Sequence, residues 1–164
     1  MTELRGYIEA VNHPSSILFA TDGKPHSLRA EEWAIEMVRS FNIPLTVLHV
    51  KDAYLKQFYN EIYAQGRKEY LEHVDKELME AEEAIRSDIV QRLSHLGLSY
   101  SFRVRYGDPL DEIIAEISGG DYDLLVLGGK RLSGMRAFRS WNLPARLSAR
   151  LGTVSIMIVR EEDS

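Results

Sequence analysis

Residues 16–34 read SILFATDGKPHSLRAEEWA and residues 121–160 read DYDLLVLGGKRLSGMRAFRSWNLPARLSARLGTVSIMIVR, and these two stretches decide the fold. Each begins with an apolar run typical of a buried strand, which is followed by a glycine-bearing loop and a helical pattern. In a parallel sheet the loops that follow strands gather at one edge and form a ligand crevice. We therefore expect residues from opposite ends of the chain to line one site.

The remainder of the chain alternates between strand and helix patterns. Strands are predicted at residues 17–21, 44–50, 99–106, 124–127 and 154–159, and helices at residues 28–41, 68–96, 109–119 and 143–151. The order βαβαβαβαβ predicts an α/β domain with a five-stranded, mostly parallel sheet and helices on both of its faces.

Two helix starts and one helix face are specified further. Ser27 is expected to cap the first helix with its hydroxyl, and Asp108 and Asp111 are expected to serve the cap and the dipole of the helix that begins at Pro109. The apolar face of the first helix is predicted to comprise Leu28, Trp33, Ala34, Met37, Val38 and Phe41.

Length and composition indicate one domain. The 164 residues divide into an N-terminal arm, residues 1–15, and a domain over residues 16–164. The absence of cysteine excludes disulfides and thiol catalysis. No apolar run approaches about 20 residues, so we expect no membrane insertion, and we expect a cytoplasmic protein.

Charge is distributed unevenly along the chain. The net charge of −5 argues against nucleic-acid binding. Six basic residues and no acidic one nevertheless lie in the segment after the fourth strand: Lys130, Arg131, Arg136, Arg139, Arg146 and Arg150. Because this segment is expected at the crevice edge, it favours an anion, although a solvated surface is the alternative.

Candidate residues for chemistry are few. Asp22 follows the first strand, where its carboxylate could accept a hydrogen bond from a ligand or simply serve a turn. Gly128 opens the loop after the fourth strand, where backbone N–H groups could approach a phosphate. His49 is expected to be packed, and the histidines show no metal-ligand spacing. No P-loop, G-x-G-x-x-G or G-x-S-x-G motif is present.

Five segments in the right order resemble the universal stress protein family: ILFATDG, LTVLHV, GDPLDEII, DYDLLVLG and TVSIMIVR. The resemblance covers residues 16–160. It implies an adenine-nucleotide-binding α/β fold and a homodimer paired through the last strand, Val154 to Val159. The implied ligand site comprises Thr21, Asp22, Val50, Gly128, Lys130, Arg131, Gly134, Trp141 and Asn142.

The chain departs from the motif G-x-x-G-x9-G-[ST] that the family's nucleotide binders carry. Gly128 matches the first glycine, but Arg131 and Trp141 stand at the other two and Asn142 at the hydroxyl position. Glycine lets the backbone come close to a phosphate, which Arg and Trp do not. The resemblance thus implies a retained adenosine half and a replaced phosphate half.

We therefore expect a dimeric regulatory binding protein, not an enzyme, with a weak or altered site for ATP, another adenine nucleotide or another anion. The alternatives are an interaction module that binds no ATP and whose crevice is filled by its own side chains, such as Trp141, and an enzyme of the same broad fold. An ATP pyrophosphatase would need an S-G-G-x-D-S-type loop after the first strand, and a phospho-receiver would need paired acids there, whereas TDGKPHS offers neither.

Overall fold

A five-stranded parallel sheet organises the computed structural model, which describes residues 13–52, 67–129 and 143–162. The strands are β1 (Ile17–Thr21), β2 (Leu45–Asp52), β3 (Tyr100–Gly107), β4 (Leu124–Gly129) and β5 (Ser155–Arg160). Their order is β3-β2-β1-β4-β5, and every neighbouring pair is parallel. The predicted fold class is confirmed, with strand ends displaced by one or two residues.

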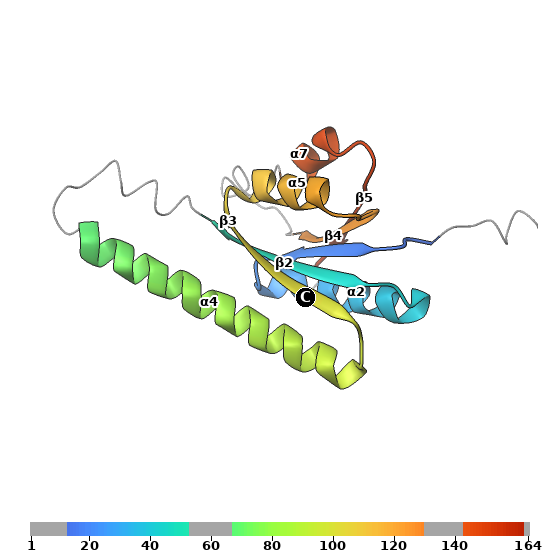
Figure 1. Ribbon diagram of the computed structural model, residues 1–164, viewed down its shortest axis with the longest axis horizontal. Coiled ribbons are helices and arrows are strands. Elements are labelled where there is room, and N and C mark those ends of the chain that lie inside the picture. Colours follow the sequence, from blue (N-terminus) through green and yellow to red (C-terminus); the bar gives the residue numbers. More distant parts are fainter. Residues whose placement is uncertain (1–12, 53–66, 130–142, 163–164) are drawn as a thin grey trace, which may run out of the picture.

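Helices cover both faces of this sheet. They are the short 3₁₀ helix η1 (Pro25–Ser27), α2 (Leu28–Phe41), α4 (Arg67–Leu96), α5 (Pro109–Gly119) and α7 (Leu143–Arg150). Figure 1 shows α2 and α4 on one side of the sheet and α5 and α7 on the other. Two apolar clusters, one under each helix pair, form the core. None of the described helices is long and apolar enough to cross a membrane.

Helix α2 buries only part of the predicted face. Ala30, Ala34 and Val38 lie against the sheet, whereas Trp33 is 46 % exposed and Leu28 is 48 % exposed. The predicted face is thus confirmed at Ala34, Val38 and the half-buried Met37. It was wrong at the large residues of its margins, Leu28, Trp33 and Phe41, which are exposed. Small side chains let the helix axis approach the strands closely, so the larger ones are displaced to the margins of the contact.

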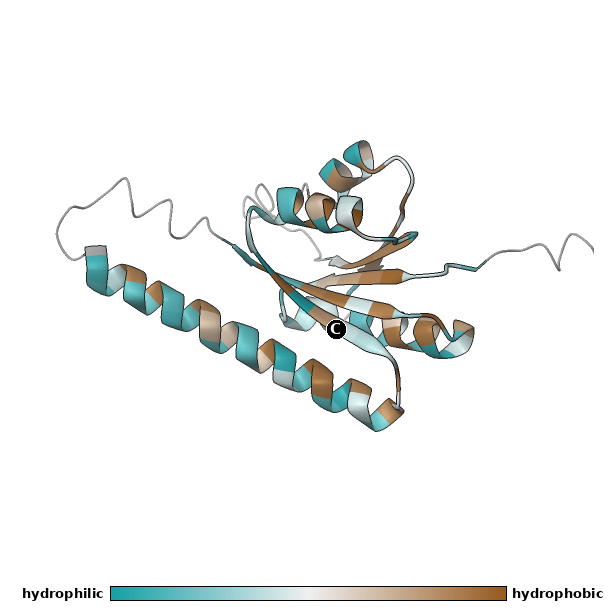
Figure 2. Cartoon of the chain, in the orientation of Figure 1, coloured by the Kyte–Doolittle hydropathy of each residue, from teal (hydrophilic) through white to brown (hydrophobic). Residues whose placement is uncertain are grey.

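Helix α4 packs on the sheet through its C-terminal half. Ile85, Ile89 and Leu93 belong to the core cluster that it shares with α2, while Ala81, one turn earlier, is exposed. The N-terminal half extends beyond the sheet and is largely hydrophilic (Figures 1 and 2). Ion pairs between residues four apart, such as Lys76–Glu80 at 3.7 Å, support that half.

The chain enters β1 through a tie to the start of β4. The carboxylate of Asp123 accepts hydrogen bonds from the backbone N–H of Ser15 (2.8 Å), the hydroxyl of Ser15 (2.9 Å) and the backbone N–H of Ser16 (3.1 Å). Burial alone would raise the pKa of Asp123, but these hydrogen bonds outweigh it and lower the pKa. The tie fixes β1 beside β4 at the edge opposite the crevice.

Candidate functional site

The order of the strands changes direction between β1 and β4. These strands are neighbours, with Ala20 opposite Leu127, yet the next described helices, α2 and α7, lie on opposite faces of the sheet. In an open parallel sheet such a divergence leaves a crevice beyond the carboxyl ends of the two strands. Asp22 follows β1 directly and Gly128 lies near the end of β4. The crevice is therefore where residues 16–34 meet residues 121–160.

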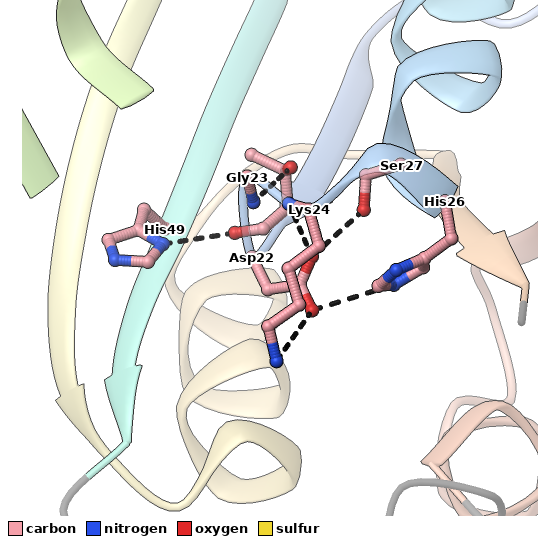
Figure 3. A network of polar contacts seen from close by, with 7 residues as sticks. Asp22, Gly23, Lys24, His26, Ser27 and His49 are labelled. Atoms are coloured by element: carbon pink, nitrogen blue, oxygen red, sulfur yellow. Dashed lines mark hydrogen bonds and ion pairs between the residues drawn. The ribbon is translucent and has the colours of Figure 1, made fainter. Parts of the chain in front are cut away.

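The Asp22 carboxylate is held by the loop that follows it (Figure 3). Its Oδ1 accepts hydrogen bonds from the Lys24 backbone N–H and from the Ser27 hydroxyl, both at 3.1 Å. Its Oδ2 lies 3.5 Å from His26 Nε2 and 3.8 Å from Lys24 Nζ. Asp22 is thus both a turn residue and a partly exposed carboxylate, because 42 % of its side chain remains accessible.

Ser27 contributes to this network instead of capping α2. The prediction of a side-chain cap was wrong, because the Ser27 hydroxyl makes no cap hydrogen bond and donates to Asp22. The preceding helix η1 explains the difference: Ser27 is its last residue and has helical backbone angles (φ −90°, ψ −13°), whereas a capping residue is typically extended. By contrast, the prediction for α5 is confirmed, since Asp108 Oδ1 accepts from the N–H groups of Leu110 and Asp111 at 3.0 and 3.2 Å.

Thr21 and His49 form the buried floor beneath Asp22. The Thr21 hydroxyl oxygen accepts from the Gly23 N–H at 3.0 Å, and the Thr21 carbonyl accepts from His49 Nδ1 at 3.1 Å. Both residues are buried, so the expectation of a packed His49 is confirmed. The His49 ring thus ties β2 to the end of β1 at the base of the crevice.

Gly128 brings β4 and η1 together. A methyl group on its Cα would lie 2.7 Å from the His26 carbonyl oxygen and 2.9 Å from the Ser27 Cα. Glycine is therefore required here by the close approach of two segments of this chain, which no sequence pattern indicated. The same contact holds His26 and Ser27 next to the end of β4.

Gly23 makes a second close contact, with α4. It has a φ of +71°, and a methyl group there would lie 2.3 Å from Ile85 Cγ1. The loop that carries Asp22 therefore rests directly on α4. Behind it, between α2 and α4, lies a cavity of about 90 Å³, much smaller than the roughly 300 Å³ or more of typical ligand sites.

The remaining predicted site residues divide into one that is described and five that are not. Val50 lies one position beyond His49 on β2, half-buried in the cluster under α5 and α7. The other five lie outside the described residues: Lys130, Arg131, Gly134, Trp141 and Asn142. The structure thus brings Thr21, Asp22 and Gly128 to the ends of neighbouring strands and adds Lys24, His26 and Ser27.

Sequence reasoning missed Lys24 and assigned Ser27 another role. The available indication was the Pro25 that follows Asp22-Gly23-Lys24, because proline in a first turn permits a short helix before α2.

A larger open hollow of about 530 Å³ lies elsewhere, over β3 and α5. Its arginines and glutamates pair with one another, and none of the predicted site residues lines it.

Comparisons with known proteins agree with this geometry. Residues 15–160 match the model of the Universal stress protein family. A search of the curated proteins found no match.

Several solved structures share the fold. The universal stress protein UspA from Lactobacillus plantarum superposes with a TM-score of 0.66 at 16 % identity, covering 91 % of this chain and 100 % of that one. A universal stress protein in complex with cAMP gives 0.57 at 21 % identity, covering 91 % and 98 %. A universal stress protein family protein from Arabidopsis thaliana with AMP bound gives 0.58 at 20 % identity, covering 91 % and 93 %.

Proposed function

This chain belongs to the universal stress protein family, and from that premise we propose that it is a regulatory binding protein whose crevice holds an adenine nucleotide or a related anion weakly. The observation that carries the proposal is the Asp22 carboxylate, which is partly exposed beyond β1 and adjoins the end of β4 through η1. Two proteins of the same fold are described as complexes with cAMP and with AMP, which supports this ligand class.

The phosphate half of the site is the part that weakens binding. Arg131, Trp141 and Asn142 stand where nucleotide binders of the family carry two glycines and a hydroxyl. Each replacement removes a close backbone or hydroxyl contact to phosphate. Hydrogen bonds to a charged group contribute about 1.5–3 kcal/mol each, so the loss of two or three weakens binding by roughly a thousandfold or more.

Calorimetry with ATP tests this proposal. We expect the parent protein to bind ATP with a Kd in the high micromolar range or weaker, roughly −5 to −6 kcal/mol. The combined substitutions Arg131→Gly, Trp141→Gly and Asn142→Ser should tighten binding, and Asp22→Asn should weaken it in both backgrounds. Submicromolar binding by the parent would contradict the proposal.

We further propose that the protein acts by binding and not by turnover. The Ser27 hydroxyl donates to Asp22 Oδ1, and His26 Nε2 faces the other oxygen of the same carboxylate. Ser27 thus donates to a carboxylate, which is a weak base, whereas a nucleophilic serine is typically activated by a histidine that accepts its proton. Steady hydrolysis of ATP by the purified protein, abolished by Ser27→Ala, would contradict this assignment.

An interaction module without nucleotide is the second candidate. It is favoured by one observation, namely that Asp22 already accepts two hydrogen bonds from its own loop. Mass spectrometry of small molecules released from the purified protein separates the two candidates. Co-purified adenine nucleotide supports the first, and its absence together with no calorimetric response to ATP supports the second.

We also propose that the protein is a homodimer paired through β5. This strand is at one edge of the sheet, and its Ile158 is 40 % exposed. An apolar edge strand is a ready template for pairing with another chain.

A further inference from the structure

The two oxygens of Asp22 have different surroundings. Oδ1 accepts two hydrogen bonds at 3.1 Å, from the Lys24 N–H and the Ser27 hydroxyl, so the loop uses its acceptor capacity. Oδ2 has two nitrogen neighbours at longer range, His26 Nε2 at 3.5 Å and Lys24 Nζ at 3.8 Å. Oδ2 is therefore the oxygen that a ligand hydroxyl would use.

The two longer distances suit a bridging oxygen atom. They exceed the usual 2.7–3.2 Å of a hydrogen bond to nitrogen. An oxygen about 2.7 Å from Oδ2 can, however, lie about 2.9 Å from either nitrogen at the same time. Such an oxygen donates to Asp22 and accepts from Lys24 or His26, and a second oxygen on the neighbouring carbon can accept from the other nitrogen.

The three groups are presented together at the crevice. Figure 3 shows the side chains of Lys24 and His26 approaching the same oxygen of Asp22 from two sides. Lys24 is 62 % exposed and can follow a ligand, whereas His26 is only 11 % exposed and holds a fixed position. Gly128 maintains that position because β4 contacts the backbone of His26 directly.

We propose that Lys24 and His26 are specificity-determining residues that, with Asp22 Oδ2, bind a vicinal diol. The chemistry calls for a hydroxyl donor beside a second oxygen that accepts, and the ribose of an adenosine ligand carries such a pair. This inference rests on the proposed function, because it assigns the ligand group that Asp22 holds. It adds two residues to the site and a selectivity for ribose over sugars that lack the diol.

The proposal is tested by measuring the dissociation constants of adenosine and of 2′,3′-dideoxyadenosine separately, by calorimetry, for the parent and each variant. The quantity compared is the ratio of the dideoxyadenosine Kd to the adenosine Kd. The parent should bind adenosine at least about tenfold more tightly, as expected for loss of hydrogen bonds to charged groups. Lys24→Met and His26→Gln should each reduce this ratio to about threefold or less. The affinity for the dideoxy compound should stay within about twofold of the parent value.

Two controls accompany these variants. Lys68→Met removes a cation that is 90 % exposed on α4 and should leave the ratio unchanged. Melting curves identify any variant with altered folding; if His26→Gln fails to fold, Lys24→Met decides alone, since it preserves the backbone N–H that donates to Asp22.

The outcomes separate this inference from the proposed function. A ratio in both variants equal to that of the parent overturns the assignment of Lys24 and His26, while adenosine binding still supports the proposed function. A parent that binds both nucleosides equally also overturns the inference alone. A parent that binds neither nucleoside overturns the inference, and the proposed function falls with it only if the parent also binds no ATP.

Discussion

A missing methyl group at Gly128 sets the distance between β4 and η1. Because a Cβ there would lie 2.7 Å from the His26 carbonyl oxygen, Gly128→Ala must push the two segments apart. We expect a loss of about 1–3 kcal/mol in the free energy of unfolding, as for other overpacked sites. Urea unfolding measures it.

Gly119→Ala is the matched control for that substitution. Gly119 lies at the end of α5, and a methyl group there meets no atom within 4 Å. Alanine at this position should be neutral or slightly stabilising, by up to about 1 kcal/mol. Equal stability losses in the two variants would contradict the close-contact argument.

Glu116 is a buried acid whose charge is supported by three neighbours. Arg105 Nε and Arg103 Nη1 each lie 2.9 Å from its carboxylate, and the Tyr122 hydroxyl donates to it at 2.9 Å. Burial alone would raise the pKa of Glu116, but the hydrogen bonds from Arg105 and Tyr122 and the charge of Arg103 outweigh it, so the pKa is lowered.

The lowered pKa of Glu116 gives stability a defined pH dependence. A depressed folded-state pKa contributes stability above the ordinary glutamate range, about pH 4.3, and this contribution is lost as the pH falls through the folded value. Glu116→Gln should therefore cost about 1–3 kcal/mol at pH 7. Its difference from the parent should shrink in acid, whereas the exposed Glu83→Gln should show no such trend.

At the scale of elements, α4 is a helix of two unlike halves. Ile89 belongs to the core and is 2 % exposed, whereas Met79, ten positions earlier, is 67 % exposed. Ile89→Ala should lower the free energy of unfolding by about 2–4 kcal/mol because it leaves a cavity. Met79→Ala should change it by less than about 0.5 kcal/mol, and thermal and urea unfolding compare the two.

The C-terminal half of α4 also contacts the segments that form the crevice. Its Arg92 binds the buried Glu31 of α2 through two hydrogen bonds, and Ile85 contacts Gly23. The pKa of Arg92 is raised chiefly by the hydrogen bonds to Glu31. If Ile89→Ala and Met79→Ala both lowered the free energy of unfolding by several kcal/mol, the N-terminal half of α4 would be as firmly packed as the C-terminal half, which would contradict this description of the helix.

At the scale of the whole molecule, the proposed dimer places two β5 strands side by side. Ile158→Lys should shift the protein toward monomer, because it introduces a charge into the apolar edge while its partly exposed position lets the lysine reach water. Met79→Lys adds the same charge on α4 and should leave the mass unchanged. Sedimentation velocity at micromolar concentration decides, and a monomeric parent would contradict the proposal.

The sequence by itself determined the strands, the helices and their order. Apolar runs such as ILFAT and the three- and four-residue steps of α4 are local patterns, and in alternation they leave a parallel sheet with helices on both faces as the consistent arrangement. The placement of Asp22 and Gly128 at adjoining strand ends followed from that topology. The packed His49 and the cap at Asp108 were also predictable from position.

The tertiary structure decided which side chains meet. Ser27 is a residue type that favours a cap, yet as the last residue of η1 it has helical backbone angles, and its hydroxyl donates to Asp22. Trp33 fitted the helical period, yet the alanines of α2 set the approach to the sheet and left the tryptophan at the margin. Periodicity gives the direction of a side chain around its own helix, but hydrogen-bond partners and interhelical distances depend on segments remote in sequence, which only the folded chain brings together.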